Sequence, residues 1–478
     1  MKTLPRQLIA AMAVSAALAA LSACAPLPPK DAAPTLNAPQ SNDFVQTKDS
    51  QWPAADWWKQ YGDDQLDRLI RQALDNSPTM AVAQARIKQA DAVSAATAAA
   101  AGVNLTANGF VSRQRYSENY IYPPPLAGEY DNSGLLHLDF SYDFDFWGRN
   151  RSALEAALGQ HAAAQADAAA SAASLSAAVA KAYFQWQLLN ARIALIAAIQ
   201  QQRTDLVGLE AQRVQAGLGA GSNVQPLLAD AAAPRQTIIQ LETQRDQALY
   251  QLKSLVGGHD IGELKQAELP QASAGLPSSL PLDLVARRPD VSAARDRVQA
   301  SLKNVDAARA EFYPDINIGA FLGLNSLRMG KLLSNSSLEA GVTPAFHLPI
   351  FDAGRLRANL DIERSGTAVA VAQYDQSVQN AVAEVNDAAI RVDGAERERA
   401  SLEKQQQARQ HDYDAATLRF KAGLADRRES VRTRLGLLAL QDQELNRHFQ
   451  ALNAQVDLTK ALGGGYQDKH GGNTKAQP

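Results

Sequence analysis

Several features that mark other classes of protein are missing from this chain of 478 residues. It has one cysteine, Cys24, so no disulfide can form within it. Its formal net charge of −3 offers no basic surface to a nucleic acid. Beyond Cys24 there is no run of about 18 apolar residues, which excludes a transmembrane helix. The 7 histidines have no metal-ligand spacing and the carboxylates form no catalytic arrangement, so we predict no enzyme, metal or cofactor.

The N-terminus carries a targeting segment. Lys2 and Arg6 precede an Ala-rich apolar stretch at 8–21 that is too short to span a membrane comfortably. The stretch ends in Leu-Ser-Ala-Cys, which resembles the processing box of bacterial lipoproteins, so we predict that Cys24 is lipidated. The alternative is a free cysteine within an ordinary secretory signal. Ala25, rather than Asp, follows the cysteine, which favours delivery to the outer membrane.

The chain repeats itself once, with a fixed offset. Three strings return 206 residues later: WGR at 147–149 as AGR at 353–355, QAGL at 215–218 as KAGL at 421–424, and LVGG at 255–258 as ALGG at 461–464. Such a repeat is too long for a solenoid unit and indicates a duplicated half-molecule.

Each half contains a predicted β-hairpin, at 103–145 and at 314–348. In the first, apolar residues from Leu136 to Phe144 alternate with polar ones over about nine residues, the length that a tilted strand needs to cross a bilayer. Pro344 indicates an irregular or terminal position for the last strand. The alternative is a soluble sheet with one wet face. If the chain spans a membrane, four strands are too few to close a barrel, so several chains must share one.

Long helical stretches follow each hairpin. Residues 150–212 contain no proline and would form about 95 Å of helix. Similar stretches at 223–255 and 355–460 are predicted to break at Pro226, Pro234 and Gly423. Helices of this length indicate a coiled coil or a helical barrel, and their many small residues allow close approach.

Several strings, taken in order, carry a family resemblance. They are WWKQYGDDQLDRLI (57–70), DFWGRNR (145–151), VARRPDV (285–291), FYPDINI (312–318), PIFDAGRLR (349–357) and TKALGGGY (459–466). The chain resembles the TolC-like outer-membrane efflux channels, in their lipoprotein branch. The resemblance implies an α+β membrane protein: a homotrimer whose twelve-stranded β-barrel, four strands per chain, continues as a periplasmic α-helical barrel. It also implies a passive exit duct for drugs or other toxic molecules, docked to a periplasmic adaptor and an inner-membrane pump.

The resemblance further implies roles for individual residues. The helix tips that contact the adaptor are Ala216, Gly217, Leu218, Ala422, Gly423 and Leu424, and the corners between strand and helix are Gly148, Arg149, Gly354 and Arg355. The tunnel mouth contains Asn223, Glu429 and Arg432, where the family often has acidic residues. We therefore expect a mouth that is less cation-selective than is usual in the family. A turn without a partner, and a plain solvated charge at each corner, are the alternatives.

Two other functions remain as alternatives at this point. One is a periplasmic coiled-coil lipoprotein scaffold or adaptor without a pore, and the other is a lipid-anchored envelope enzyme. The predicted organisation is a signal peptide at 1–23, a lipid-anchored tether and N-terminal segment at 24–56, a first repeat at 57–258, a linker at 259–279, a second repeat at 280–464 and a disordered tail at 465–478.

Overall fold

The computed structural model describes residues 29–30, 32–40, 43–45, 52–270 and 287–467. The predicted signal peptide, Cys24 and most of the predicted tail lie outside these residues. The chain forms two compact units. Unit 1 contains Ile87–Ala163 and Ala294–Tyr374, and unit 2 contains Asn37–Arg86, Ala164–Ala293 and the chain from Asp375 onward. No described helix is both long enough and apolar enough to cross a membrane.

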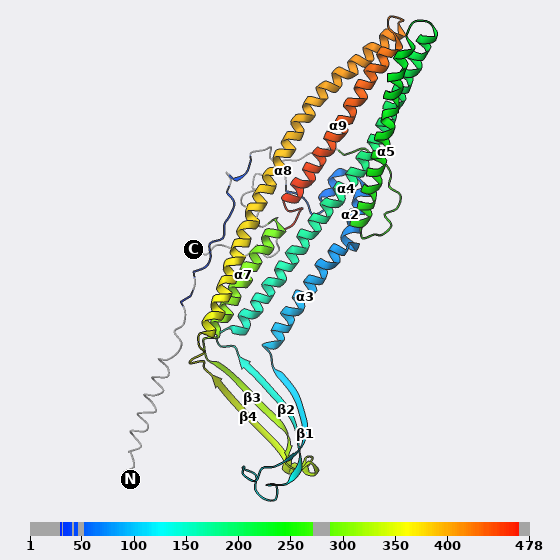
Figure 1. Cartoon of the computed structure of the whole chain (residues 1–478). Helices are drawn as coiled ribbons and strands as arrows, with labels where there is room; N and C mark the ends of the chain where they lie inside the picture. Colours follow the sequence, from blue (N-terminus) through cyan, green and yellow to red (C-terminus); the bar gives the residue numbers. More distant parts are fainter. Residues whose placement is uncertain (1–28, 31, 41–42, 46–51, 271–286, 468–478) are drawn as a thin grey trace. The chain divides into compact units, whose positions relative to one another are not determined.

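Unit 1 contains an antiparallel sheet of four strands in the order β1-β2-β3-β4 (Figure 1). Both predicted hairpins are therefore confirmed. Pro344 pairs with Ile318 in β4, which is one of the two edge strands of the sheet within this chain. The strands are β1 (Asn104–Arg115), β2 (Tyr130–Phe144), β3 (Asp315–Ser326) and β4 (Leu338–His347).

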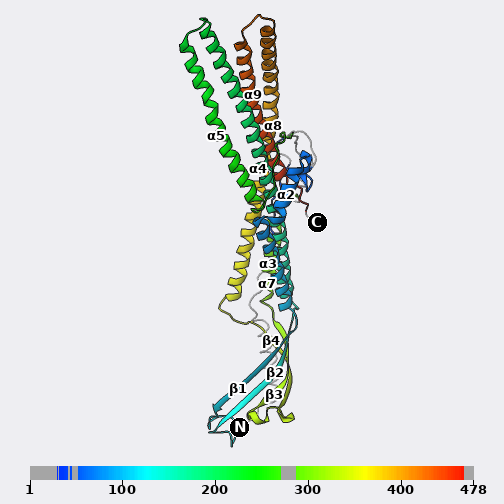
Figure 2. The ribbon, with the colours of Figure 1, turned by 90° about the vertical axis from the view of Figure 1, so that its right-hand side faces the viewer.

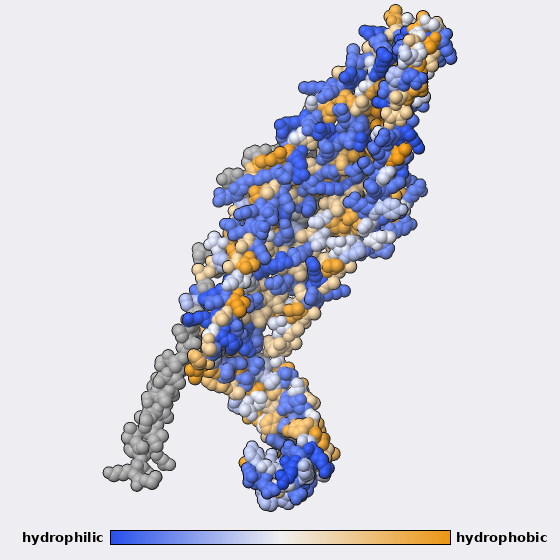
Figure 3. Space-filling model, in the orientation of Figure 1, coloured by the Kyte–Doolittle hydropathy of each residue, from blue (hydrophilic) through white to orange (hydrophobic). Residues whose placement is uncertain are grey.

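The register of the sheet separates two faces. Leu138 of β2 lies opposite Ala107 of β1 and Leu322 of β3, so the alternating apolar residues of all strands share one face. These apolar side chains are exposed: 44% for Leu138 and 54% for Leu322. Hydrophobic residues accordingly reach the surface of the sheet in Figure 3, whereas the helices show mostly hydrophilic surface. The other face carries polar residues, including Asn108, which donates to Asp139 at 2.8 Å.

Helices of matched length follow the two hairpins (Figures 1 and 2). Each half contributes one helix of 67 residues, α4 and α8, which agrees with the predicted duplication. In unit 1, Gly159 of α4 lies against Ala300 of α7, and a Cβ at Gly159 would come within 3.0 Å of the Ala300 Cβ. The helices are α2 (Asp64–Asn76), α3 (Pro78–Ala100), α4 (Arg149–Gln215), α5 (Val224–Leu255), α7 (Pro289–Ala310), α8 (Arg355–Lys421) and α9 (Arg427–Ala461).

The predicted breaks at Pro226 and Pro234 are both wrong. Pro226 lies in the first turn of α5, where a missing N–H costs no helical bond, and the helix continues through Pro234. A proline at this position cannot donate to the carbonyl of Asp230, four residues earlier. Arg203 of α4 supplies the missing donor, since its Nη1 lies 2.6 Å from the Asp230 carbonyl oxygen. A side chain of the neighbouring helix α4 thus donates to the carbonyl that Pro234 leaves without a donor. Local sequence does not reveal this donor.

The WWKQYGDDQLDRLI string contributes buried residues to the core of unit 2. The 3₁₀ turn Trp57–Tyr61 and α2 place Trp57, Leu66 and Ile70 in one apolar cluster with α4. Tyr61 packs edge-on against Phe184, with ring centroids 5.2 Å apart. Burying each such side chain contributes about 1.5–3 kcal/mol.

Two glutamine side chains hold the extended linker that follows α5. Gln65 accepts from the Lys265 N–H at 2.8 Å and donates back to the Lys265 carbonyl at 3.0 Å. Gln187 donates to the same carbonyl and accepts from the Ala267 N–H at 2.9 Å. The amides therefore bind the linker as a neighbouring β-strand would, through its main chain alone.

Candidate functional site at the helix tips

The first helix tip is a sharp turn between α4 and α5. After α4 ends at Gln215, Gly217 adopts a φ of 74°, and the Leu218 N–H donates to the Arg213 carbonyl at 2.8 Å. These bonds are those of a Schellman turn, in which glycine relieves the strain of a left-handed residue. The turn leaves the Leu218 side chain 67% exposed.

The second tip, between α8 and α9, repeats this geometry. Gly423 has a φ of 73°, and the Leu424 N–H donates to the Arg419 carbonyl at 2.9 Å. Leu424 is 81% exposed. In Figure 2 the two turns lie at the same end of the helices, and Ala216 and Ala422 are exposed beside their glycines. Each tip therefore presents one apolar side chain on a rigid turn.

A buried ion pair connects the two tips. Glu210 of α4, only 5% exposed, accepts from the Arg428 guanidinium of α9 at 2.7 Å. Arg428 also donates to Asp426 at 2.7 Å, and Arg213 lies 3.8 Å from Glu210. Asp426 begins α9 as its N-cap and accepts from the Arg428 N–H at 2.9 Å. That backbone hydrogen bond is the largest cause holding the pKa of Asp426 below its ordinary value.

Sequence reasoning missed Glu210 and the capping role of Asp426. An Asp followed three residues later by Glu429 is a capping-box pattern, so the cap had a sequence signal. No sequence signal marked Glu210, because it is one acid among many polar residues of a long helix. Its role depends on the tertiary packing that brings it next to Arg428.

The predicted mouth residues are exposed and stay separate from one another. Asn223 precedes α5 as its N-cap without a side-chain capping bond. Glu429 lies in the first turn of α9, 3.5 Å from Arg419 of α8. Arg432 lies one turn further along α9 and is exposed. Within the described part of the chain, no hydrogen bond or ion pair joins these three side chains to one another.

The predicted corners lie where strands become helices in unit 1. Gly148 and Gly354 have φ of 78° and 88°, and α4 and α8 begin at the next residues, Arg149 and Arg355. Asp352 accepts from the Leu356 and Gly354 N–H groups at 2.7 and 3.0 Å, and its bond to Leu356 is the main cause of its lowered pKa.

Short described parts of the predicted tether lie along α8. The Asn386 side chain of α8 accepts from the Val45 N–H at 2.9 Å and donates to the Asp43 carbonyl at 2.7 Å. Nearby, the Asn37 N–H donates to Asp375 at 3.3 Å. The predicted lipid site, Cys24, precedes these segments and lies outside the described residues.

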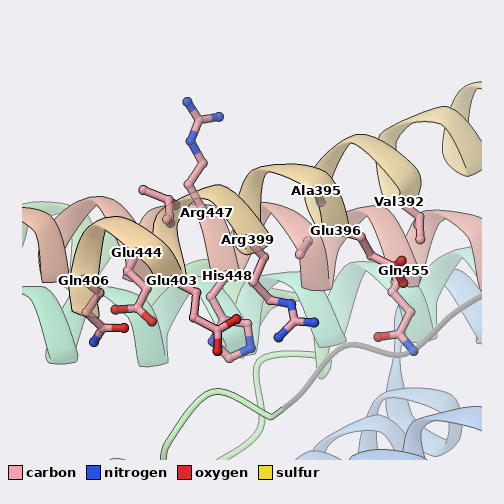
Figure 4. Close-up of a pocket in the computed structure, with 12 residues that line it drawn as sticks. Val392, Ala395, Glu396, Arg399, Glu403, Gln406, Glu444, Arg447, His448 and Gln455 are labelled. Atoms are coloured by element: carbon pink, nitrogen blue, oxygen red, sulfur yellow. The ribbon is translucent and has the colours of Figure 1, made fainter. Parts of the chain in front are cut away.

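A polar cavity of about 250 Å³ lies between α8 and α9. In Figure 4, Arg399, Glu403 and His448 point to the same side, and Arg447 points away. His448 Nε2 lies 2.8 Å from the Pro270 carbonyl, and Arg447 pairs with Glu398 at 3.0 Å, so both have structural partners. No group of three or more metal-ligating side chains occurs among the residues that the structure describes.

A four-stranded amphipathic sheet joined to paired long helices, with an exposed leucine at each tip, is the architecture of a TolC-like outer-membrane channel. The fold class predicted from the sequence is thus confirmed. The profile of the family described as Outer membrane efflux protein matches residues 69–258 and 280–464. The chain therefore belongs to that family.

Comparisons with individual proteins agree with this family assignment. The chain is 34% identical over 461 residues to the multidrug resistance outer membrane protein MdtP of Escherichia coli K12, covering 94% of both chains. It is 34% identical over 438 residues to MdtQ of Escherichia coli O6:H1, covering 87% of this chain and 89% of MdtQ. The solved outer membrane protein VceC of Vibrio cholerae matches with 30% identity and a TM-score of 0.76, covering 87% of this chain and 100% of VceC.

The protein is thus an outer-membrane channel that serves as an efflux exit duct, as its motif strings predicted. Its relatives are named as outer membrane and channel proteins rather than as enzymes. Nothing in these similarities supports the alternative of a coiled-coil scaffold without a pore.

Proposed function

We propose that three copies of this chain share one closed barrel of twelve strands. The observation that carries the proposal is the sheet of unit 1, whose β1 and β4 are edges and whose apolar face is exposed. Val342 of β4 is 68% exposed and Leu105 of β1 is 59% exposed, which favours lipid as their neighbour. Closing the barrel between subunits pairs both edges, as a membrane requires.

Electron microscopy of the detergent-solubilised protein tests this assembly. We expect a threefold object with a long hollow cylinder. Cysteine pairs placed along β1 and β4 should also form disulfides between subunits, giving a covalent trimer on a non-reducing gel. A detergent-free monomer that buries its apolar strand face would contradict the proposal.

The trimer acts as the outer part of a tripartite efflux system. Its tips dock to a periplasmic adaptor that is coupled to an inner-membrane pump, through Leu218 and Leu424 and their neighbouring Ala and Gly residues. The exposure of both leucines on rigid turns supports this role. The cargo is drugs or other toxic small molecules, in line with the names of MdtP and MdtQ. The duct performs no chemistry and needs no cofactor.

Drug resistance in a strain that lacks its own exit duct, supplied with a compatible pump and adaptor, tests the docking role. We expect Leu218→Ser with Leu424→Ser to abolish resistance while leaving the amount of trimer and the channel conductance unchanged. Leu228→Ser, which alters an exposed leucine of α5 outside the tips, is the matched control and should retain resistance. Full resistance in the double tip variant would refute docking through these leucines.

Lipidation of Cys24 anchors the chain in the outer membrane beside its own barrel. The sole cysteine follows an apolar leader and two small residues, which supports the assignment. Mass spectrometry of the mature N-terminus tests it, and a free thiol or a retained leader would overturn it. The organisation into a tether, two repeats and a linker between them remains part of the same proposal.

The mouth at Asn223, Glu429 and Arg432 selects cations weakly. Exposed arginines at the tips, including Arg427 and Arg432, support a weak preference because they offset the carboxylates. Reversal potentials in planar bilayers under a salt gradient test it. We expect Arg432→Glu to increase cation selectivity; strong cation selectivity that Glu429→Ala abolishes would contradict the proposal.

A further inference from the structure

The two helix tips of unit 2 share their backbone geometry but differ in charge. Residues 213–228, at the first tip, include one ionisable side chain, Arg213. Residues 419–434, at the second tip, include six basic and two acidic side chains, so this tip is cationic. The offset of the sequence repeat places Lys421 over Gln215 and Arg427 over Gly221. The duplication therefore kept the turn and changed the charge around it.

The carboxylates of the second tip already have cationic partners. Asp426 accepts from the Arg428 guanidinium at 2.7 Å, and Glu429 lies 3.5 Å from Arg419. Arg428 is also held by Glu210 of α4 at 2.7 Å. Asp426 and Glu429 are thus not available to the other cations of the tip.

Two cations of the second tip have no such partner. Lys421 and Arg427 are exposed, and they lie three residues before and after Leu424. Neither side chain makes a hydrogen bond or ion pair with the part of the chain that the structure describes. The first tip of a second copy has no carboxylate over 213–228 to offer them. An exposed leucine between two unpaired cations therefore distinguishes the second tip from the first.

Arg427 occupies a position where a cation does not favour folding. It is the first residue of α9, at the positive end of the helix dipole, where an unpaired cation is unfavourable. Lys421 is the last residue of α8, at a negative helix end, where a cation is favourable. Helix stability thus accounts for Lys421 but not for Arg427, which favours a partner outside the chain for the arginine.

We propose that the second tip docks against an acidic surface of the periplasmic adaptor, whereas the first tip docks through apolar contact alone. Carboxylates of the adaptor flank Leu424, pair with Lys421 and Arg427, and speed association at low salt. The same two cations repel a partner with basic residues there, so the second tip selects among adaptors. This partner chemistry rests on the proposed docking of the tips to an adaptor.

Binding of the adaptor to the purified full-length trimer, measured by surface plasmon resonance in detergent at several salt concentrations, tests the proposal. The probe is the adaptor that gives drug resistance with the wild-type channel. We expect Lys421→Gln with Arg427→Gln to slow association about tenfold at low salt. At about 1 M salt, where the screening length is about 3 Å, the wild type should slow to the rate of the variant.

Two matched controls separate the second tip from charge in general. Lys404→Gln removes an exposed cation of α8 about 25 Å along the helix from Lys421 and should match the wild type. Gln215→Lys gives the first tip the cation that the second has at the equivalent position, and it should not speed association. An equal effect of Lys404→Gln would overturn the proposal, because it would show attraction to the whole helix rather than to the tip.

Charge reversal gives a readout in cells. Lys421→Glu with Arg427→Glu should abolish drug resistance at an unchanged amount of trimer, and suppressor mutations in the adaptor should replace acidic residues. Wild-type association rates in the glutamine variant at low salt would overturn the proposal. If the leucine-to-serine double variant loses adaptor binding and the glutamine variant does not, only the acidic partner surface is refuted. If neither variant loses binding, docking through the tips fails as well.

Discussion

The sheet of unit 1 exposes the same kinds of apolar residue that the core of unit 2 buries. In the core, Phe184 and Leu66 are fully buried against protein. In the sheet, Phe346 and Leu138 are 64% and 44% exposed. The difference shows that apolar content alone does not locate a protein core. The partner of each apolar surface has to be identified, and for the sheet the proposed partner is the bilayer.

The strongest test of this contrast removes one aromatic ring from each region. Phe184→Ala leaves a cavity in a packed core and should lower the free energy of unfolding by about 3–5 kcal/mol. Phe346→Ala opens no cavity within the subunit and should cost less than half as much. Denaturant titration in detergent, followed by tryptophan fluorescence, measures both. Equal losses would mean that the sheet face also packs against protein.

A charge placed on either face of β2 tests which face meets lipid. Leu138→Lys should destabilise the inserted channel by about 2–4 kcal/mol, because it puts an ammonium at mid-strand depth in hydrocarbon. Ser141→Lys, on the polar face of the same strand, should be tolerated. Folding into lipid vesicles, followed by gel mobility with and without heating, measures both. Tolerance of the lysine at 138 would rule out lipid contact there.

The buried pair at the tips should matter more than an exposed pair elsewhere on the helices. Replacing Arg428 with Gln should cost about 1–3 kcal/mol, because buried Glu210 then keeps only Arg213, 3.8 Å away, as a charged partner. Glu210→Gln should cost less, because Arg428 is partly exposed and keeps Asp426 at 2.7 Å. Arg397→Gln breaks an exposed pair with Asp393 on α8 and should cost about 0.3–0.5 kcal/mol. A double-mutant cycle measured by thermal unfolding isolates the coupling, and zero coupling would refute the pair's role.

Apart from the exposed-pair control, the smallest expected effect comes from the cap of α9. Asp426→Ala should cost about 1 kcal/mol at neutral pH. The pKa of Asp426 is lowered in the folded state, so its contribution is fully present above its ordinary value of 3.8. The contribution disappears as the pH falls through the still lower folded value. Thermal unfolding of both proteins against pH should therefore converge in acid, and a constant gap would contradict the assignment.

Much of this fold could be predicted because its signals are local. Strict alternation from Leu136 to Phe144 identified β2, and Gly217 and Gly423 identified the two turns. The continuity of α5 through Pro234 could not be predicted, since it depends on a donor from α4. Glu210 was missed for the same reason, because its partner lies 218 residues away in sequence. The mouth residues depend on subunits that one chain does not contain.

The hydrogen bonds from the two glutamines to the linker affect which substitutions the linker sequence can accept during evolution. The hydrogen bonds that Gln65 and Gln187 make to the linker go only to main-chain atoms of Lys265 and Ala267. The side chains at those two positions are therefore free to drift during evolution, with proline alone prohibited because both N–H groups donate. The glutamines have no such freedom, since a glutamate at either position would replace the donor with a negative oxygen facing the Lys265 carbonyl.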